Sequence, residues 1–469
     1  MKRREIKIKA LQQLTFKCLM LLGCILINTT SYAEIKLPAI FGSNMVLQRN
    51  SEVSVWGTAT ANSEVTVFTS WNDRSYETTA DKEGNWNIKV STPGAGGPYD
   101  IKLSDGEELM LKNVLIGEVW LCSGQSNMER TLRGAGNDPI LGSNEAILRS
   151  DNPSIRFFTV ENEKSEVPED DFKGDWKVCD RSTAPDFSAT GYFFGNLVQE
   201  ILEVPVGLIS SDWGGTRIQR WMDEGTIKTF DPEDWESSPS TLFNAMINPM
   251  LGFSIKGVIW YQGESNRKNP EIYDEMMVKL VQSWREKWGI GDFPFYYCQI
   301  APFQYDDTVN TAFLREAQLK ASKEIPNSGM VSLLDVGEER NIHPANKRAA
   351  GERLAYFALK ETYGIEGISA RGPEYLEMKI EGATVELMFN ERLTSFGKEL
   401  KWFEVAGKDQ KFYHAKARIK GKSVILVSDE VAEPVAARYG FKNFVNGDLY
   451  NIHGLPASSF RTDNWVEEK

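Results

Sequence analysis

Hydrophobic and polar residues follow two different patterns along the chain, and the change of pattern divides it into three regions. Residues 34–111 and 366–469 contain short runs in which apolar and polar residues alternate, with glycine, proline and asparagine between the runs. A period of two is typical of antiparallel strands that bury one face. We therefore predict a β-sandwich-like domain at 34–111 and a β-rich region at 366–469 that packs on the domain between them.

The middle region, residues 112–365, alternates near-continuous apolar runs of strand length with longer amphipathic segments. The apolar runs lie at 114–124, 204–211, 255–263, 293–301 and 329–336. The segments with a helical period lie at 192–202, 272–288, 311–325 and 347–364. Strands that are apolar on both faces and alternate with helices indicate a parallel sheet covered by helices on both sides. The predicted fold class is therefore α/β, with β-rich regions at both ends.

Four polar clusters follow predicted strands of this middle region. They are SGQSN at 123–127, SDWGGTR at 211–217, QGESN at 262–266 and ERNIHP at 339–344. Ligands of parallel sheets bind outside the carboxyl ends of the strands. We therefore expect the four clusters to meet at one edge of the sheet.

The first cluster contains the strongest candidate for chemistry, Ser126. It follows an apolar strand through a turn, and the chain can continue as a helix after Met128. Such a turn exposes a serine hydroxyl, and the N–H groups that open the helix can stabilise an oxyanion. The alternative is an ordinary Ser/Gly/Asn loop. The residues in the other clusters distinguish a catalytic serine from an ordinary loop.

A serine nucleophile needs a base, which is usually histidine, and the chain has only three. His343 is the one that lies in the α/β region, after a predicted strand and before a predicted helix. We predict that it is the base for Ser126. His414 and His453 lie in the C-terminal region and are predicted to be structural.

The second and third clusters supply candidate donors for an oxyanion. The N–H groups of Gly214 and Gly215 can approach a charged oxygen without a Cβ in the way, although a plain tight turn explains them equally well. Gln262 or Asn266 could add a side-chain amide. Arg217 could pair with a substrate carboxylate, or it could hold a neighbouring acidic residue.

Composition narrows the class of protein without identifying a ligand. Of the 469 residues, 41% are hydrophobic and 25% are charged, which is ordinary for a soluble globular protein. The net charge of −13 argues against nucleic acid and anionic membrane surfaces as partners. The three cysteines beyond the N-terminal segment have no metal-like spacing. We therefore predict no metal site.

Residues 1–33 have the composition of a signal peptide: a basic start, an apolar run and a small-x-small site that ends at Ala33. The apolar run is too short for a good membrane span. Cleavage after Ala33 and export to the periplasm or the cell exterior are predicted. The alternative is a lipoprotein anchored through Cys24.

Taken in order, the polar clusters resemble the sialate O-acetylesterase family, a branch of the SGNH-type hydrolases. The matching segments are GQSNM at 124–128, SDWGGT at 211–216 with Trp221 and Met222, WYQGESN at 260–266, and IHP at 342–344 with Asn346 and Lys347. Segments at 44–48, 454–457 and 460–462 also resemble the family, so the likeness covers nearly all of the chain beyond residue 33.

The resemblance implies a flavodoxin-like SGNH domain at 112–365 that hydrolyses O-acetyl esters of sugars, typically sialic acids, without a metal or cofactor. It implies that Ser126 attacks the acetyl carbonyl and that His343 moves the proton. The implied oxyanion donors are the N–H of Ser126, an N–H of Gly214 or Gly215, and Gln262. The predicted substrate-binding residues are Arg217, Asn127 and Glu264.

The sequence departs from the family at one position. Members often carry Asp two residues before the histidine, where this chain has Asn341. Asp335, Glu338 and Glu339 are the nearby alternatives for the third member of a triad, and a Ser-His dyad is another. Two other functions remain open at this stage. One is deacetylation of xylan or another hemicellulose, and the other, which Asn341 favours, is carbohydrate binding on a degenerate esterase scaffold.

Overall fold

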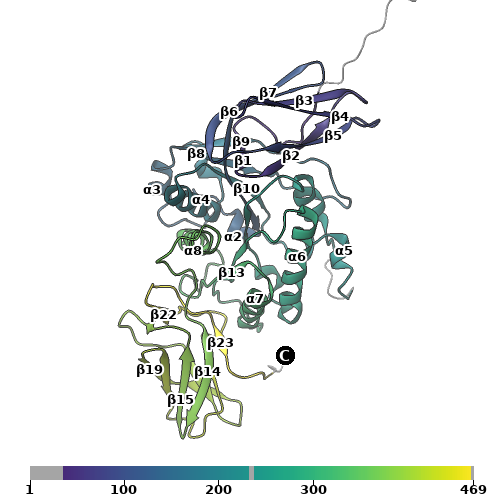
Figure 1. Ribbon diagram of the computed structural model, residues 1–469. Coiled ribbons are helices and arrows are strands. Elements are labelled where there is room, and N and C mark those ends of the chain that lie inside the picture. Colours follow the sequence, from purple (N-terminus) through teal and green to yellow (C-terminus); the bar gives the residue numbers. More distant parts are fainter. Residues whose placement is uncertain (1–34, 232–236, 466–469) are drawn as a thin grey trace, which may run out of the picture.

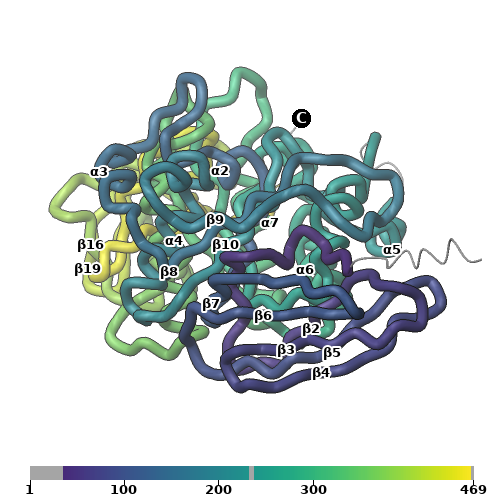
Figure 2. Tube along the Cα trace, turned by 90° about the horizontal axis from the view of Figure 1, so that it is seen from above, coloured from purple at the N-terminus to yellow at the C-terminus, as the bar shows by residue number. Residues whose placement is uncertain are grey.

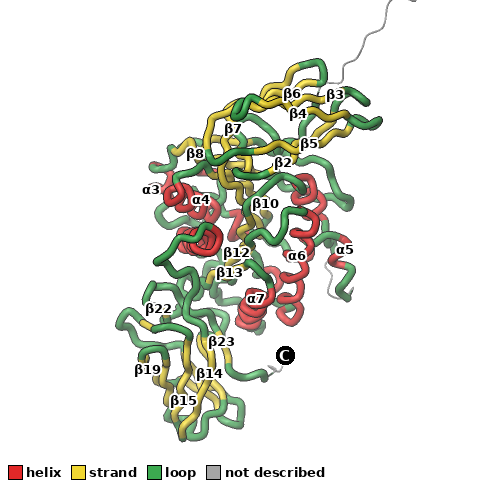
Figure 3. The backbone as a smooth tube through the Cα atoms, in the orientation of Figure 1, coloured by secondary structure: helices red, strands yellow, loops and turns green. Residues whose placement is uncertain are grey.

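The computed structural model describes residues 35–231 and 237–465. The predicted signal peptide, including Cys24, lies outside the described residues. The α-helices of the described residues lie in the middle of the molecule, and strands form both ends (Figure 3). The predicted α/β class with β-rich ends is therefore confirmed. Within the described ranges, no helix combines the length and apolar character needed to cross a bilayer.

The strands of the N-terminal and middle regions are β1 (Val46–Gln48), β2 (Glu52–Thr58), β3 (Glu64–Thr69), β4 (Arg74–Thr79), β5 (Asn85–Ser91), β6 (Gly96–Ser104), β7 (Glu108–Gly124), β8 (Asn152–Thr159), β9 (Trp176–Cys179), β10 (Val206–Asp212), β11 (Gly257–Tyr261), β12 (Phe295–Cys298) and β13 (Ser328–Val331). The C-terminal strands are β14 (Tyr375–Glu381), β15 (Thr384–Phe389), β16 (Leu393–Thr394), β17 (Phe403–Ala406), β18 (Phe412–His414), β19 (Lys416–Lys420), β20 (Ser423–Val427), β21 (Ala436–Tyr439), β22 (Tyr450–Asn451) and β23 (Phe460–Arg461). The α-helices are α2 (Ser126–Glu129), α3 (Ser143–Leu148), α4 (Ala189–Leu202), α5 (Glu224–Ile227), α6 (Tyr273–Trp288), α7 (Ala312–Glu324) and α8 (Lys347–Phe357).

The middle region is built on one sheet with the strand order β13-β12-β11-β7-β10-β8-β9. All neighbouring pairs are parallel except β8 and β9. Counted in chain order, the six parallel strands β7, β8, β10, β11, β12 and β13 lie in the spatial order 2-3-1-4-5-6, so strands are added on both sides of β7 as in open doubly wound sheets. In such a sheet the carboxyl end of the first strand, β7, lies beside a change in strand order, which is where ligands bind.

Helices cover both faces of this sheet, with α4 and α8 on one side and α6 and α7 on the other (Figure 1). The last part of β7 shows why consecutive residues of a central strand are apolar. Val119 and Leu121 belong to the hydrophobic cluster on the α6 side, and Trp120 and Cys122 belong to the cluster on the α4 side. Consecutive side chains point into opposite hydrophobic cores. The alternation of apolar and polar residues that is typical of a half-exposed strand is therefore absent.

The strands of the N-terminal region gather at one side of the molecule (Figure 2), and all pair antiparallel except β1, which pairs in parallel with β7. Strands β2 and β5 form a pair, and β4-β3-β6-β7 form a second layer that shares their hydrophobic core. The predicted boundary between 111 and 112 falls inside β7, because this one strand pairs with β6 at its start and with β10 and β11 at its end. The N-terminal layer is thus continuous with the parallel sheet.

The C-terminal region contains two four-stranded sheets, β14-β15-β20-β19 and β18-β17-β21-β23, and the short pair β16-β22. Its contact with the middle region depends on the fully buried guanidinium of Arg315 in α7. This group donates to Ser459 Oγ at 3.1 Å and to the Gly440 carbonyl at 3.2 Å. Arg461 on β23 adds a second contact, because its guanidinium donates two 2.9 Å hydrogen bonds to Glu316 of α7. The C-terminal region is thereby tied to the helix that also packs on the central sheet.

Candidate active site

The chain makes a sharp turn between β7 and α2, and this turn presents Ser126. Gly124 ends the strand with φ of 140°, and a Cβ there would lie 2.2 Å from the Tyr261 carbonyl oxygen, so only glycine fits. The N–H of Gln125 donates to the same carbonyl at 2.9 Å. Helix α2 then begins at Ser126, whose side chain is only slightly exposed. The predicted strand-to-helix turn is present.

His343 lies on the loop after β13 and contacts Ser126, as the sequence predicted. Its Nε2 is 2.9 Å from Ser126 Oγ. The loop is held where it leads into α8, because Lys347 Nζ donates to the Pro344 carbonyl at 2.8 Å and Asn346 caps the helix by accepting from the Ala349 N–H. Nucleophile and base are thus in direct hydrogen-bond reach.

The other ring nitrogen of His343 contacts a residue that sequence analysis missed. Nδ1 lies 2.9 Å from Asp138 Oδ2. Asp138 comes from the loop after α2, only twelve positions beyond Ser126, in a segment without a recognisable motif. The same loop meets the histidine loop through a 2.9 Å bond from the Leu141 N–H to the Ala345 carbonyl. Ser126, His343 and Asp138 therefore have the contacts of a Ser-His-Asp triad.

The residues that the sequence offered as partners of the His343 ring make other contacts. Asn341 Oδ1 accepts from the backbone N–H of His343 at 3.0 Å, so it shapes the loop. Asp335 forms two 2.7 Å bonds with Arg353, and Glu338 accepts from a backbone N–H of the histidine loop at 2.7 Å. Within the described structure, no hydrogen bond joins the imidazole ring to any of these candidates, which are Asn341, Asp335, Glu338 and Glu339. The ring contacts Asp138 instead, which makes Asp138 the candidate for the third member of the triad.

The environment of His343 keeps its imidazole neutral. Burial lowers its pKa below the usual value, and the positive charge of Arg130 lowers it further, whereas Asp138 raises it and only in part offsets them. A neutral imidazole whose Nδ1 faces a carboxylate presents an unprotonated Nε2 to the serine hydroxyl. That is the state a general base needs at neutral pH.

Two of the predicted oxyanion donors lie beside Ser126. Ser126 is the first residue of α2, so its N–H has no acceptor within the helix. Gly214 is in close contact, since a Cβ at this position would lie 3.3 Å from Ser126 Cβ. Its N–H donates to Glu129 Oε2 at 3.0 Å, so a substrate oxygen has to displace this carboxylate. Gly215 is exposed, with φ of 73°, and completes the turn.

Gln262 does not have the predicted orientation. It is fully buried, and its amide nitrogen donates to the Thr216 carbonyl at 3.1 Å and to Asn266 Oδ1 at 2.8 Å. Its oxygen accepts from Tyr273 of α6 at 2.8 Å. With both amide hydrogens engaged, Gln262 supports the loop that contains Gly214 instead of donating to an oxyanion. The same holds for Asn266, whose amide donates to Gln219 at 2.9 Å.

Asn127 and Glu264, predicted to bind substrate, are buried and contact each other. Asn127 Nδ2 donates to Glu264 Oε1 at 2.6 Å and to the Ile342 carbonyl at 3.1 Å, and its oxygen accepts from Lys347 Nζ at 2.6 Å. Burial raises the pKa of Glu264 and lowers that of Lys347 to about 7. This network joins the helix of Ser126 to the loop of His343 and leaves neither residue accessible to substrate.

Arg217, the remaining predicted substrate-binding residue, lies on the loop after β10, three positions beyond Gly214. Its side chain is partly buried, and within the described residues its guanidinium has no hydrogen-bond or ion-pair partner. On the same loop Trp213 is partly buried, and Lys164 Nζ lies 5.0 Å from the centre of its ring. The loop therefore carries one cationic side chain and one aromatic ring within three positions of Gly214, and Lys164, from the segment after β8, adds a second cation at the ring.

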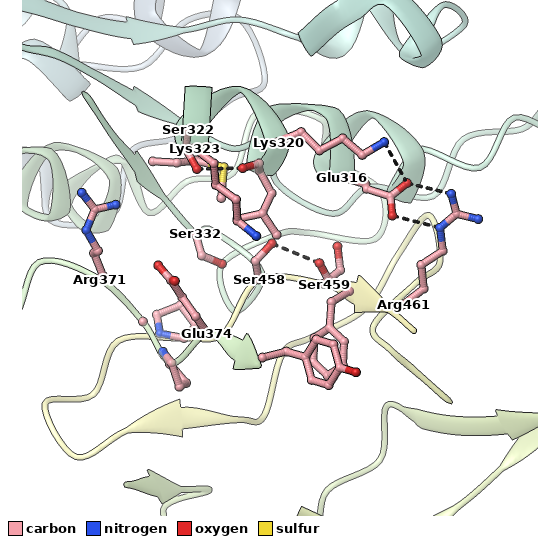
Figure 4. A pocket seen from close by; sticks show the side chains of 17 residues that line it. Glu316, Lys320, Ser322, Lys323, Ser332, Arg371, Glu374, Ser458, Ser459 and Arg461 are labelled. Carbon is pink, nitrogen blue, oxygen red and sulfur yellow. Dashed lines mark hydrogen bonds and ion pairs between the residues drawn. The ribbon is translucent and has the colours of Figure 1, made fainter. Parts of the chain in front are cut away.

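No other place in the described structure offers comparable chemistry. A cavity of about 300 Å³ lies between α7 and the C-terminal region (Figure 4). No histidine lines it, and its serine hydroxyls bond to backbone or neighbouring side chains. Within residues 35–231 and 237–465, no three His, Cys, Asp or Glu side chains are grouped to hold a metal ion.

Comparison with known families identifies the central region as a carbohydrate esterase. The family profile described as carbohydrate esterase, sialic acid-specific acetylesterase matches residues 116–360, which contain all three residues of the triad arrangement. The sialate O-acetylesterase of Mus musculus is 27% identical over 437 residues, which cover 77% of this chain and 80% of the mouse protein. That of Homo sapiens is 27% identical over 420 residues, with 79% and 80% covered.

A solved structure extends the similarity to nearly the whole chain. The crystal structure of a carbohydrate acetylesterase from Xanthomonas citri has a TM-score of 0.86 and 34% sequence identity. The match covers 92% of this chain and 100% of that one. The similarity therefore includes the β-rich regions at both ends as well as the central sheet.

Proposed function

Because the chain belongs to the carbohydrate esterase family of sialic acid-specific acetylesterases, and is thus a carboxylic ester hydrolase, we propose that it removes O-acetyl groups from sialic acids by Ser-His-Asp catalysis. The observation that carries the mechanism is the pair of 2.9 Å contacts of His343, from Nε2 to Ser126 Oγ and from Nδ1 to Asp138 Oδ2. We assign residues 112–365 to an SGNH-type domain on the same basis. Export through the signal at 1–33 is part of the proposal.

In the first half of the reaction, Ser126 Oγ attacks the acetyl carbonyl while His343 Nε2 takes the hydroxyl proton. Asp138 holds Nδ1–H and balances the positive charge that forms on the ring. The carbonyl oxygen becomes an oxyanion beside the N–H groups of Ser126 and Gly214, after it has displaced Glu129. Each such donor lowers the barrier by roughly 2.7–4 kcal/mol.

The tetrahedral intermediate then collapses. His343 returns the proton to the sugar oxygen, the bond between this oxygen and the acetyl carbon breaks, and the acetyl group stays on Ser126. Water then attacks the acetyl-enzyme, with His343 again as the base, and acetate leaves as Ser126 regains its proton. The products are the deacetylated sugar, with a free hydroxyl group, and acetate, and no electron transfer occurs. The chemistry uses side chains that the chain itself provides.

An unpaired cation beside the site supports an anionic sugar as the substrate. The guanidinium of Arg217 has no partner among the described residues, so it is available for bidentate pairing with a ligand carboxylate. Sialic acids carry a carboxylate, whereas acetylated xylan does not. Lys164 adds positive charge above Trp213, and the ring supplies an apolar surface for the sugar. A local cationic site of this kind outweighs the acidic net charge of the chain.

Replacing Arg217 with methionine is expected to raise KM for O-acetylated sialic acid about tenfold or more, because a bond between two charged groups contributes about 1.5–3 kcal/mol. The variant should leave KM for a neutral acetylated xylo-oligosaccharide within twofold. Arg217→Lys keeps the charge but loses bidentate pairing, and should give an intermediate KM. Equal effects on both substrates would show that Arg217 does not bind the carboxylate.

The proposed function is tested by measuring acetate release from O-acetylated sialic acid and from acetylated xylan in parallel. We expect kcat/KM to favour the sialic acid by at least tenfold. A preference for xylan would assign the enzyme to hemicellulose deacetylation. Failure to release acetate from either substrate or from p-nitrophenyl acetate would leave the carbohydrate-binding alternative, although Asp138 removes the reason that Asn341 gave for it.

A further inference from the structure

Arg130, the residue that follows α2, contacts both His343 and Asp138. Its Nε donates to Asp138 Oδ2 at 2.8 Å, the same oxygen that lies 2.9 Å from His343 Nδ1. Its Nη2 is 3.2 Å from Nδ1 and 3.5 Å from Nε2 of the imidazole. One guanidinium therefore contacts the base and the acid together. The motif that revealed Ser126 gave no role to this arginine.

The two distances place the guanidinium over the face of the imidazole ring. An atom in the ring plane at similar distances from both nitrogens would overlap the carbon between them. Nη2 therefore lies above the plane, where it does not compete with Ser126 Oγ for the lone pair of Nε2 or with Asp138 for Nδ1–H. A cation in this position opposes a positive charge on the ring without blocking either hydrogen bond of His343.

The other charged groups that face His343 are few. Asp138, from the loop after α2, favours the imidazolium, whereas Lys347, from α8, opposes it. Lys347 is buried, its own pKa is lowered to about 7, and its amine is held by Asn127 and the Pro344 carbonyl. The guanidinium of Arg130 touches the ring, whereas the amine of Lys347 is held by other groups, so Arg130 is the stronger opponent of protonation.

We propose that Arg130 is a positioning residue that keeps the catalytic histidine unprotonated under mildly acidic conditions while it fixes the carboxylate that orients this histidine. The inference rests on the proposed function in that His343 is the base. It assigns to Arg130 a role that a Ser-His-Asp arrangement does not require by itself.

The arrangement has consequences for both halves of the reaction. A base with a lowered pKa stays available for attack at lower pH, which extends activity in the acidic direction. After attack, the imidazolium lies against Arg130, which makes it a stronger acid and favours return of the proton to the sugar oxygen. The hydrogen bond between Arg130 and Asp138 keeps the carboxylate in place through both steps.

The test is the pH dependence of kcat/KM for p-nitrophenyl acetate, whose acidic limb reports the base of the free enzyme. In Arg130→Met, the limb should move to higher pH by about one unit, so activity on the acidic side should fall about tenfold relative to the plateau. Arg130→Lys retains the charge and should keep the limb near its wild-type position. A methionine variant with an unchanged limb would overturn the proposal.

The direction of the shift separates this role from a purely structural one. If Arg130 only anchored Asp138, its removal would let this carboxylate move away from the imidazole. The pKa of His343, which Asp138 raises, would then fall, and the limb would move to lower pH. A shift in that direction would contradict the proposal. A wild-type protein without esterase activity would instead refute the proposed function and leave the role of Arg130 to be decided by a measurement that needs no turnover.

That measurement is an NMR titration of the histidine side chains in the full chain, which has only three histidines. His343→Asn assigns the His343 signal, and the exposed His414 and His453 provide references in the same spectrum. His343 in the wild type should titrate below the ordinary value of about 6.5 and should move upward in Arg130→Met. Should the methionine variant fail to fold, a wild-type midpoint at or above the ordinary value would still overturn the inference.

Discussion

Ser126→Ala is expected to lower kcat for p-nitrophenyl acetate and for O-acetylated sialic acid by about 10⁴- to 10⁶-fold, the range that loss of the nucleophile gives in a serine triad. The oxyanion donors and the binding site remain, so KM should change little. The variant should fold normally, because Ser126 Oγ makes its side-chain contact with His343 and alanine fits the first position of α2.

Ser123→Ala is the matched control for this experiment. Ser123 lies three positions earlier on β7, is fully buried, and its hydroxyl has no hydrogen-bond partner in the described structure. Its removal should leave kcat within about twofold and stability nearly unchanged. If both alanine variants retained wild-type activity, Ser126 would not be the nucleophile.

Asp138→Asn should reduce kcat by about 10³- to 10⁴-fold, by analogy with the same change in the triad of serine proteases. An amide cannot hold Nδ1–H and balance the imidazolium charge as a carboxylate does. The substitution also leaves Arg130 beside the ring without its anionic partner, which further disfavours the charged base. Steady-state kinetics with p-nitrophenyl acetate measures the loss, and circular dichroism confirms that the variant is folded.

Asp335→Asn distinguishes the acid that contacts His343 from one of the several alternatives that the sequence offered. Asp335 pairs with Arg353 on the far side of the histidine loop. Its substitution should therefore affect stability more than turnover, with kcat within about fivefold of wild type. A large loss of kcat in Asp335→Asn together with an active Asp138→Asn would favour Asp335 among the sequence-based alternatives and contradict the role of Asp138.

The central sheet could be predicted because its strands are apolar on both faces. The apolar runs at 114–124, 204–211 and 255–263 correspond to β7, β10 and β11. Burial on both faces keeps such strands apolar along their length, so they stand out in the sequence. Sequence analysis missed β8 because its residues are mixed in polarity, and it missed the edge strand β9 because that strand has only four residues. Ser126 and His343 were found because both follow buried strands directly.

The remaining site residues depend on tertiary contacts that a linear pattern does not contain. Asp138 lies in a loop without periodicity, and the bond between Leu141 and Ala345 brings it to His343. Gln262 follows a strand as predicted, but its side chain turns inward to meet Tyr273 of a distant helix. The sequence therefore located the edge of the sheet on which the site is built, and the folded loops decided which side chains face it.

The account is tested most directly by covalent labelling with a fluorophosphonate probe, followed by peptide mapping. We predict one adduct, on Ser126, that forms in the wild type and whose rate of formation falls at least about 10³-fold in His343→Ala, because the base activates the hydroxyl. An adduct on another serine, or equal labelling of Ser126 in wild type and His343→Ala, would contradict the Ser126–His343–Asp138 arrangement as the catalytic centre.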